Sequence, residues 1–162
     1  MGWLSRALKD AEDERNRLRG KSMFIPVVAA CCVRDGLILL QGREQENYKK
    51  DHLNFPGGKV EFNETLEQAL GREIFEELGV QVTGSKLIYS QVNKYPGNGN
   101  HFVVLYYEVT LESEPGIIVN GISKDLDGNN LHWVELHRVI NLKVISGTLE
   151  ALDVIRGLNV RV

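Results

Sequence analysis

Four charged side chains on one short segment carry the strongest chemical signal in this sequence of 162 residues. Arg72 is followed by Glu73, Glu76 and Glu77 within little more than one helical turn. Residues three and four apart lie on one side of a helix, so these carboxylates repel one another unless a cation lies between them. Oxygen ligands with no Cys or His nearby suit Mg²⁺ or Mn²⁺. The alternative interpretation is a solvated acidic helix face.

The surroundings of these acids favour the metal site. Gly57 and Gly58 follow a strand-like run at 53–56, and paired glycines let backbone carbonyls approach an ion closely. Thr65 is predicted to cap the N-terminus of the helix and Gly79 its C-terminus. A hydrophobic stripe at four-residue spacing lies beside the carboxylates and comprises Leu66, Leu70, Ile74 and Leu78. The acids are therefore expected at the edge of a packed face.

The segment from Gly58 to Val80 matches a known pattern at every specified position. This pattern is the Nudix box, G-x5-E-x7-R-E-U-x-E-E-x-G-U, in which U is an aliphatic residue. With ordinary residue frequencies, a chance match is on the order of 10⁻⁹ per starting position. The preceding FPGGKVE also resembles the approach to the box in MutT-type nucleotide hydrolases. The sequence is therefore identified as a member of the Nudix superfamily, which implies an α/β/α sandwich with a mixed β-sheet.

The resemblance implies a role for each residue of the acidic cluster. Glu73 and Glu77 resemble metal ligands, Glu76 is the next candidate, and the Gly57 carbonyl would complete the shell. A bound Mg²⁺ or Mn²⁺ would neutralise phosphate oxygens and lower the pKa of a water molecule. Arg72 resembles a residue that orients a carboxylate during catalysis, and a direct phosphate contact is its alternative role.

Candidates for the general base and for substrate contacts lie outside this cluster. Similar enzymes use a box glutamate or an acid on a later loop, where this chain has Asp125 and Asp127. A D-x-D-G-N-N string is also an ordinary turn. Arg43 has the spacing of a phosphate-contacting arginine in MutT-like enzymes, with surface solvation as its alternative. Lys59 is placed to meet the phosphates, and Phe55 either stacks on a base or packs in the core.

The family hydrolyses nucleoside diphosphates linked to a further group, X, which the box does not specify. The FPGGK approach and Arg43 favour a nucleoside triphosphate or a modified one. Pro96, sixteen residues after the box, resembles a marker of ADP-ribose hydrolases, so ADP-ribose or a nucleotide sugar is the alternative. The purine-selecting asparagine of MutT-like enzymes has no match near Gly147. An inactive ligand-binding module is a third hypothesis, but such modules typically lose box acids that this chain keeps.

Composition and charge limit the number of domains, the kind of binding partner and the location that the sequence suggests. A hydrophobic content of 43% suits one globular domain. A net charge of −3 argues against a nucleic-acid surface. The sequence contains no run of about 20 apolar residues and no signal-peptide pattern, so we expect no membrane association and a cytoplasmic location. The adjacent Cys31 and Cys32 are predicted to fill the core of a protein in a reducing compartment.

Residues 1–22 are predicted to form a charged helical extension, and 23–162 the Nudix hydrolase domain. The extension carries a thin apolar stripe of Trp3, Leu4, Leu8, Ala11 and Leu18. This stripe could pack either on the domain or on a second copy of the chain in a homodimer. Strands are expected at 24–33, 37–41, 87–92, 102–111, 116–119 and 131–136, with a last helix at 146–157. This order predicts an α/β or α+β fold.

Overall fold

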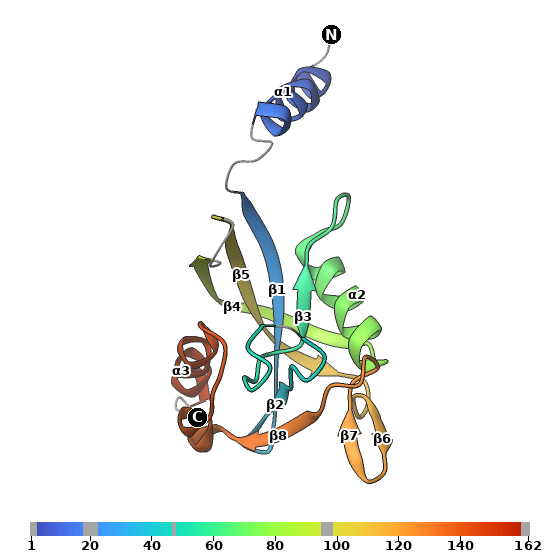
Figure 1. Cartoon of the computed structure of the whole chain (residues 1–162), viewed down its shortest axis with the longest axis vertical. Helices are drawn as coiled ribbons and strands as arrows, with labels where there is room; N and C mark the ends of the chain where they lie inside the picture. Colours follow the sequence, from blue (N-terminus) through green and yellow to red (C-terminus); the bar gives the residue numbers. More distant parts are fainter. Residues whose placement is uncertain (1–2, 18–22, 47, 95–98, 160–162) are drawn as a thin grey trace.

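The structure is a computed structural model that describes residues 3–17, 23–46, 48–94 and 99–159. These residues contain three α-helices, which are α1 (Trp3–Arg17), α2 (Leu66–Leu78) and α3 (Thr148–Asn159), and a 3-10 helix at Leu136–Asn141. Figure 1 shows α2 and α3 beside a sheet, with α1 drawn apart from it. The strands are β1 (Phe24–Arg34), β2 (Leu37–Gln41), β3 (Gly57–Lys59), β4 (Val82–Lys94), β5 (His101–Leu111), β6 (Ile117–Val119), β7 (Ile122–Lys124) and β8 (Leu131–Glu135).

The main sheet is mixed, as the sequence predicts. Its strands follow the order β4-β5-β1-β2-β8, and β3 also pairs with β1. β1 runs parallel to β5, whereas the other pairings are antiparallel. β6 and β7 form a separate hairpin. β1 therefore pairs directly with three strands of the sheet, which are β2, β3 and β5.

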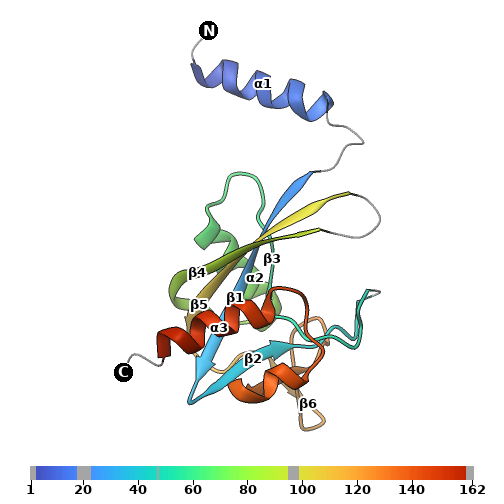
Figure 2. The same ribbon diagram turned by 90° about the vertical axis from the view of Figure 1, so that its left-hand side faces the viewer.

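Two hydrophobic cores lie on opposite faces of this sheet. Residues 70, 74 and 78 of α2 pack with Val28, Ala30 and Cys32 of β1. Residues 151, 152 and 155 of α3 pack with Ala29 and Cys31. Alternate residues of β1 thus enter different cores, as the two-residue period of a strand requires. Figure 2 shows α3 in front of the sheet and α2 behind it, which confirms the expected sandwich.

The glycines before the box form a strand that the sequence does not predict. The expected run at 53–56 makes only isolated bridges, and the strand pairing lies at β3 instead, where Gly57 pairs with Ala29. Gly57 has a φ of +152°, and a Cβ built there would lie 2.0 Å from the carbonyl oxygen of Val28. Because only glycine permits this close approach, the strand falls on residues that sequence propensity assigns to a loop.

The ends of α2 agree with the predicted caps. The Thr65 side chain accepts a hydrogen bond from the Gln68 N–H, and Gln68 completes a capping box. Gly79 ends the helix in a left-handed conformation with a φ of 70°. These caps fix where the acidic segment begins and ends.

Other elements differ from expectation, and β7 and the 3-10 helix at Leu136–Asn141 were not predicted at all. β4 begins at Val82, five residues earlier than predicted, because two register irregularities interrupt the alternation that marks a strand. In α1 the described side chains of 5–15 are exposed, including Leu8 at 64%. Leu18 lies outside the described residues. The division into 1–22 and 23–162 and the homodimer stay predictions. No described helix has the length and apolar character needed to cross a membrane.

Candidate functional site

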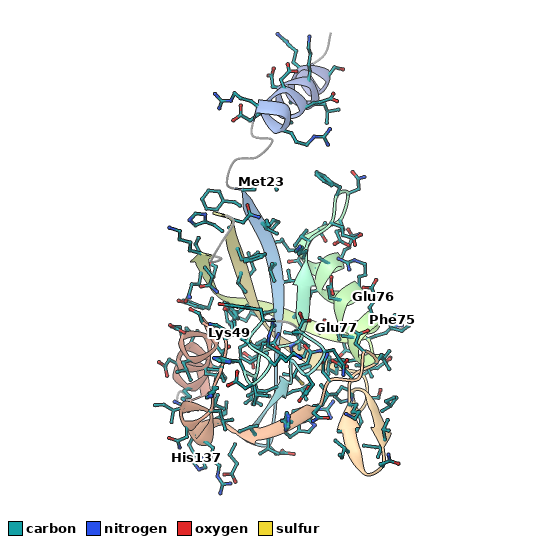
Figure 3. The ribbon with its side chains drawn as sticks, viewed as in Figure 1. Met23, Lys49, Phe75, Glu76, Glu77 and His137 are labelled. Atoms are coloured by element: carbon teal, nitrogen blue, oxygen red, sulfur yellow. The ribbon has the colours of Figure 1, made fainter. Side chains whose placement is uncertain are left out.

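The paired glycines of β3 lie directly against two acids of α2. The Gly57 N–H donates to Glu77 Oε2 at 3.0 Å. A Cβ built at Gly58 would lie 2.3 Å from the carboxyl carbon of Glu73, so this glycine leaves the space that the carboxylate fills. Figure 3 labels Glu76 and Glu77 on α2, with Glu77 nearer the sheet. The structure thus brings the glycines and these acids together.

Arg72 is the cation that already lies within the acidic cluster. Its guanidinium binds Glu64 in a bidentate manner, with Nε–Oε2 at 3.0 Å and Nη2–Oε1 at 2.6 Å. It also donates to Glu73 at 2.8 Å, to Glu76 at 3.3 Å and to the Lys59 carbonyl at 3.0 Å. The hydrogen bonds that Glu64 accepts from Arg72 and from the Glu61 N–H lower the pKa of Glu64 to about 2. Arg72 therefore sits where a residue that orients carboxylates is expected.

Glu77 differs from Glu64, Glu73 and Glu76 because it is partly buried and, among the described contacts, accepts no hydrogen bond from Arg72. Burial is the main reason that its pKa rises to about 8, and the charges of Glu73 and Asp125 raise it further. The Gly57 N–H opposes this rise. Removing a carboxylate from water favours its neutral form unless a positive charge is near. A bound cation would therefore ionise Glu77.

The acids do not already converge as a metal centre. Within the described ranges, no three His, Cys, Asp or Glu side chains form a group that could hold an ion. Glu73 and Glu76 turn to Arg72, which relieves the repulsion that the sequence predicts, while Glu77 turns to Gly57. The donor set nevertheless fits Mg²⁺ or Mn²⁺, because it offers carboxylate oxygens and, among the described residues, the partly buried Glu77 has no Lys or Arg partner.

The two aspartates of the later loop have different environments. Asp125 is only 1% exposed and accepts four hydrogen bonds. They come from Gln41 Nε2 at 2.5 Å, the Asp127 N–H at 3.0 Å, and the N–H and Nδ2 of Asn129 at 2.8 and 2.9 Å. Its oxygens are thus occupied in holding the turn. Asp127 is exposed and lines a cavity with Glu77, so of the two it is the better placed to accept a proton.

Two cavities adjoin at this end of the sheet. The first, here called the polar cavity, measures about 340 Å³ and includes Glu77 and Asp127 in its lining. The second, here called the aromatic cavity, measures about 300 Å³ and includes Phe55 and Tyr106. Both are lined by Arg43, Asn54 and Gly57. The cavities therefore share one wall.

The predicted substrate-binding residues separate into those at the cavities and one outside them. Arg43 lies in the shared wall, where its guanidinium donates to the Tyr48 carbonyl at 3.2 and 3.3 Å. Phe55 is buried and meets Tyr106 edge-on, with ring centroids 6.0 Å apart. Lys59 is exposed and lines neither of these two cavities. The marker Pro96 lies outside the described residues.

Sequence reasoning missed several polar residues that line the aromatic cavity, and three of them are Lys49, Asn54 and Asn93. Lys49 stands on the loop after β2 with a φ of +52°, and Asn93 stands near the end of β4. The only sequence feature that pointed to a place for Asn54 in the site is its position directly before Phe55. No periodic pattern marks any of the three, since they meet only through long-range pairing of strands and loops.

Known proteins resemble this chain in sequence and in fold. Residues 23–153 match a family model described as the NUDIX domain. The CTP pyrophosphohydrolase of Escherichia coli is 42% identical over 78 residues, which are 48% of this chain and 58% of that protein. The 8-oxo-dGTP diphosphatase of Proteus vulgaris is 34% identical over 90 residues, which are 56% of this chain and 78% of that protein.

Among solved structures, that of the E. coli ORF135 protein aligns with a TM-score of 0.70 and 26% identity. The alignment covers 85% of this chain and 92% of the ORF135 protein. The region shared with the CTP pyrophosphohydrolase is less than two thirds of that relative's length. The family match, by contrast, extends over most of this chain and includes the whole acidic helix. The chain therefore belongs to the NUDIX domain family.

Proposed function

We propose that this NUDIX-domain protein is a hydrolase, namely a magnesium- or manganese-dependent pyrophosphohydrolase of nucleoside triphosphates, including modified ones. Water would attack a phosphoanhydride bond of the bound nucleotide. The observation that carries the proposal is the shared wall of Arg43, Asn54 and Gly57, which joins a polar cavity containing Glu77 to an aromatic cavity. Such a pair of cavities suits a ligand that is anionic at one end and has a flat apolar ring at the other.

The polar cavity would hold the phosphates and the attacking water. When bound, the divalent ion would neutralise phosphate oxygens and lower the pKa of that water. Glu77 and Glu73 would hold the ion, with Glu76 and the Gly57 carbonyl as further ligands, while Arg72 keeps Glu73 in place. Arg43 lines this cavity and would contact the phosphate chain. Lys59 is a weaker candidate for a phosphate contact because it lines neither cavity. Asp125 is a weaker candidate for the general base because its carboxylate already accepts four hydrogen bonds.

The proton of the attacking water needs an acceptor on the protein. Asp127 is exposed and lines the polar cavity, whereas the carboxylate oxygens of Asp125 already accept three hydrogen bonds within its turn and one from Gln41. A general base must lie within reach of the proton that it removes. Asp127 is therefore the proposed acceptor on the later loop, and a box glutamate is the alternative.

The aromatic cavity would hold the nucleoside. Phe55 and Tyr106 form part of its lining, and aliphatic residues of β1 and β5 complete the apolar surface. The similar proteins are named for CTP and for 8-oxo-dGTP, both nucleoside triphosphates, which supports this substrate class. The ADP-ribose alternative rests on Pro96, for which the described residues offer no support. The binding-only alternative is disfavoured by the complete set of box acids.

A substrate panel tests the proposal. The purified chain is incubated with CTP, dCTP, 8-oxo-dGTP, dGTP, ADP-ribose and a nucleotide sugar, with Mg²⁺, with Mn²⁺ or with EDTA. We expect metal-dependent release of a nucleoside monophosphate from one or more triphosphates. Mass spectrometry of products formed in isotopically labelled water identifies the phosphorus that water attacks. Hydrolysis of only ADP-ribose or the sugar would contradict the substrate class, and no hydrolysis with either metal would contradict the enzyme itself.

A further inference from the structure

Three buried polar residues form one cluster beside the polar cavity. The buried polar residues of the described ranges are Gln41, Asp125, Asn129 and Thr148, and the first three of these contact one another. Asp125 Oδ2 accepts a hydrogen bond from Gln41 Nε2 at 2.5 Å and another from Asn129 Nδ2 at 2.9 Å. Buried polar groups cost stability unless they are paired, and a fully paired cluster fixes a single arrangement. The cluster therefore holds the Gln41 amide in a defined position.

The backbone of Gln41 is fixed as well. Gln41 is the last residue of β2, and the three residues before it, Ile38, Leu39 and Leu40, are apolar and buried. The Gln41 N–H donates to the Asn54 carbonyl at 2.8 Å, and the Gln41 carbonyl accepts from the Asn54 N–H at 3.0 Å. Because the strand before it is apolar, the core does not require an amide at this position. The amide is therefore better explained by what it contacts at the cavity.

The Gln41 amide meets a second acid, Glu77. Both residues line the polar cavity. A glutamine amide has two N–H donors, and the bond to Asp125 uses one of them. The Gln41 side chain also forms a hydrogen bond with Glu77. This bond and the one from the Gly57 N–H act against the rise in the pKa of Glu77 that burial causes. Gln41 thus lies between two carboxylates.

A neutral donor between two carboxylates suits a site that receives a cation. The charge of Asp125 acts unfavourably on ionised Glu77, and within the described contacts neither acid binds a Lys or Arg side chain. A Lys or Arg between them would neutralise their charges and compete with a divalent ion. An amide N–H orients a carboxylate and leaves its charge available to the metal. Gln41 therefore holds Glu77 without replacing the ion.

The same contacts join the later loop to the end of α2. The Asp127 N–H donates to Asp125 Oδ1 at 3.0 Å, while Gln41 holds the other oxygen of Asp125. The Leu126 N–H donates to the Glu77 carbonyl at 2.8 Å. Gln41 thus stands where β2, the later loop and the acidic helix meet.

We propose that Gln41 is a positioning residue, whose amide, anchored on Asp125, holds the Glu77 carboxylate in the orientation in which it binds the divalent ion. This inference rests on the proposed function of the same site. Residues that hydrogen-bond a metal ligand fix its direction, and their loss weakens metal binding although they do not touch the ion. Gln41 would act in this way through Glu77 alone, since the described contacts of Glu73 and Glu76 are with Arg72.

Mn²⁺ binding without nucleotide tests the proposal. The EPR signal of free Mn²⁺ gives the Kd of the wild type, of Gln41→Leu and of Gln41→Met, a second apolar variant of similar length. We expect both variants to weaken Mn²⁺ binding about tenfold or more. Gln45→Leu is the matched control, because Gln45 lies at the same cavity but is exposed. Its Kd should equal that of the wild type.

A double-mutant cycle with Glu77→Gln shows whether Gln41 acts through Glu77. If it does, adding Gln41→Leu to Glu77→Gln should change the Kd for Mn²⁺ by about twofold or less, because the ligand that Gln41 orients is already lost. A general disturbance of the site would weaken binding by the same factor in both backgrounds. Equal factors, or an unchanged Kd in both Gln41 variants, would overturn the proposal and leave the proposed function intact.

A destabilised variant elsewhere separates positioning from loss of stability. Ile155→Ala removes a buried side chain from the core beneath α3 and leaves the acids unchanged. Its melting temperature should fall, while its Kd for Mn²⁺ should stay that of the wild type. If Ile155→Ala weakens Mn²⁺ binding as much as Gln41→Leu, stability explains the effect and the proposal fails.

Triphosphate hydrolysis by the wild type separates this inference from the proposed function. Hydrolysis by a wild type that binds no Mn²⁺ on its own would overturn the inference alone. A wild type that neither binds Mn²⁺ nor hydrolyses a triphosphate would overturn both.

Discussion

Replacing Glu77 with glutamine tests whether burial of this carboxylate prepares the site for a cation. The structure raises the pKa of Glu77 from 4.5 to about 8, mainly through burial. The folded protein therefore holds this proton over a pH range in which the unfolded chain has released it. In the absence of metal, the contribution of Glu77 to stability is fully present below the unfolded pKa of 4.5. It is lost as the pH rises through about 8.

The size of the effect follows from this difference in pKa. The interval from 4.5 to about 8 corresponds to about 5 kcal/mol at about 1.4 kcal/mol per pH unit. Local relaxation and entry of water reduce the penalty of a buried charge, so we expect a loss of roughly 2–5 kcal/mol. The amide introduced by Glu77→Gln would keep an oxygen for the Gly57 N–H and would not titrate. Glu77→Gln should therefore resemble the wild type near pH 5 and exceed its stability near pH 9.

Urea unfolding measures this difference. Curves are recorded in EDTA at about pH 5, 7 and 9, and then with Mg²⁺ or Mn²⁺. Added metal should raise the stability of the wild type most at high pH, because the metal binds the ionised carboxylate of Glu77. It should raise the stability of Glu77→Gln only slightly. Turnover of Glu77→Gln should fall by orders of magnitude.

Glu76→Gln is the matched control, because the Glu76 side chain is 58% exposed. Its stability should follow the pH dependence of the wild type. If Glu77→Gln in EDTA also shows the same pH dependence as the wild type, burial does not hold the proton on Glu77 and the reasoning is refuted.

Three further predictions address the parts of the site that surround Glu77. Gly57→Ala would place a Cβ 2.0 Å from a β1 carbonyl oxygen, so the free energy of unfolding in urea should fall by about 2–4 kcal/mol; an unchanged value contradicts the close approach. Arg72→Lys removes the bidentate contact with Glu64, and initial rates should fall at least about tenfold with little change in melting temperature. Asp125→Asn should lower stability by about 1–3 kcal/mol, whereas Asp127→Asn should lower turnover and leave stability unchanged; the reverse pattern would exchange their roles.

The acidic helix could be predicted from the sequence because its signals are local. The four-residue spacing of Leu70, Ile74 and Leu78 identifies the buried face, and the structure buries all three. Thr65 and Gly79 mark the ends through hydrogen bonds and dihedral angles that involve only near neighbours. The mixed sheet followed from the family resemblance and is confirmed.

The arrangement around the helix could not be predicted in this way. Arg72 binds Glu64, eight residues away, as well as its nearer neighbours, so the cation within the cluster comes from the chain itself. Asp125 and Asp127 look alike in sequence, but contacts with Gln41, 84 residues away from Asp125, bury one and not the other. Asn54 has no periodic pattern around it, and its place in the lining of both cavities depends on contacts between distant segments. Such features depend on tertiary contacts that spacing does not encode.

The register of β1 fixes how far the proposed base site lies from the acids. Val27, Val28 and Ala29 line the aromatic cavity, and the same three residues pair with Lys59, Gly58 and Gly57 of β3. The glycines in turn contact Glu73 and Glu77. A shift of one residue would exchange the two faces of β1 and separate the glycines from the acids, so both cores oppose it. Backbone pairing therefore sets the spacing between the cavities, so a substitution in a side chain that lines them would leave the acids that would hold the metal in place.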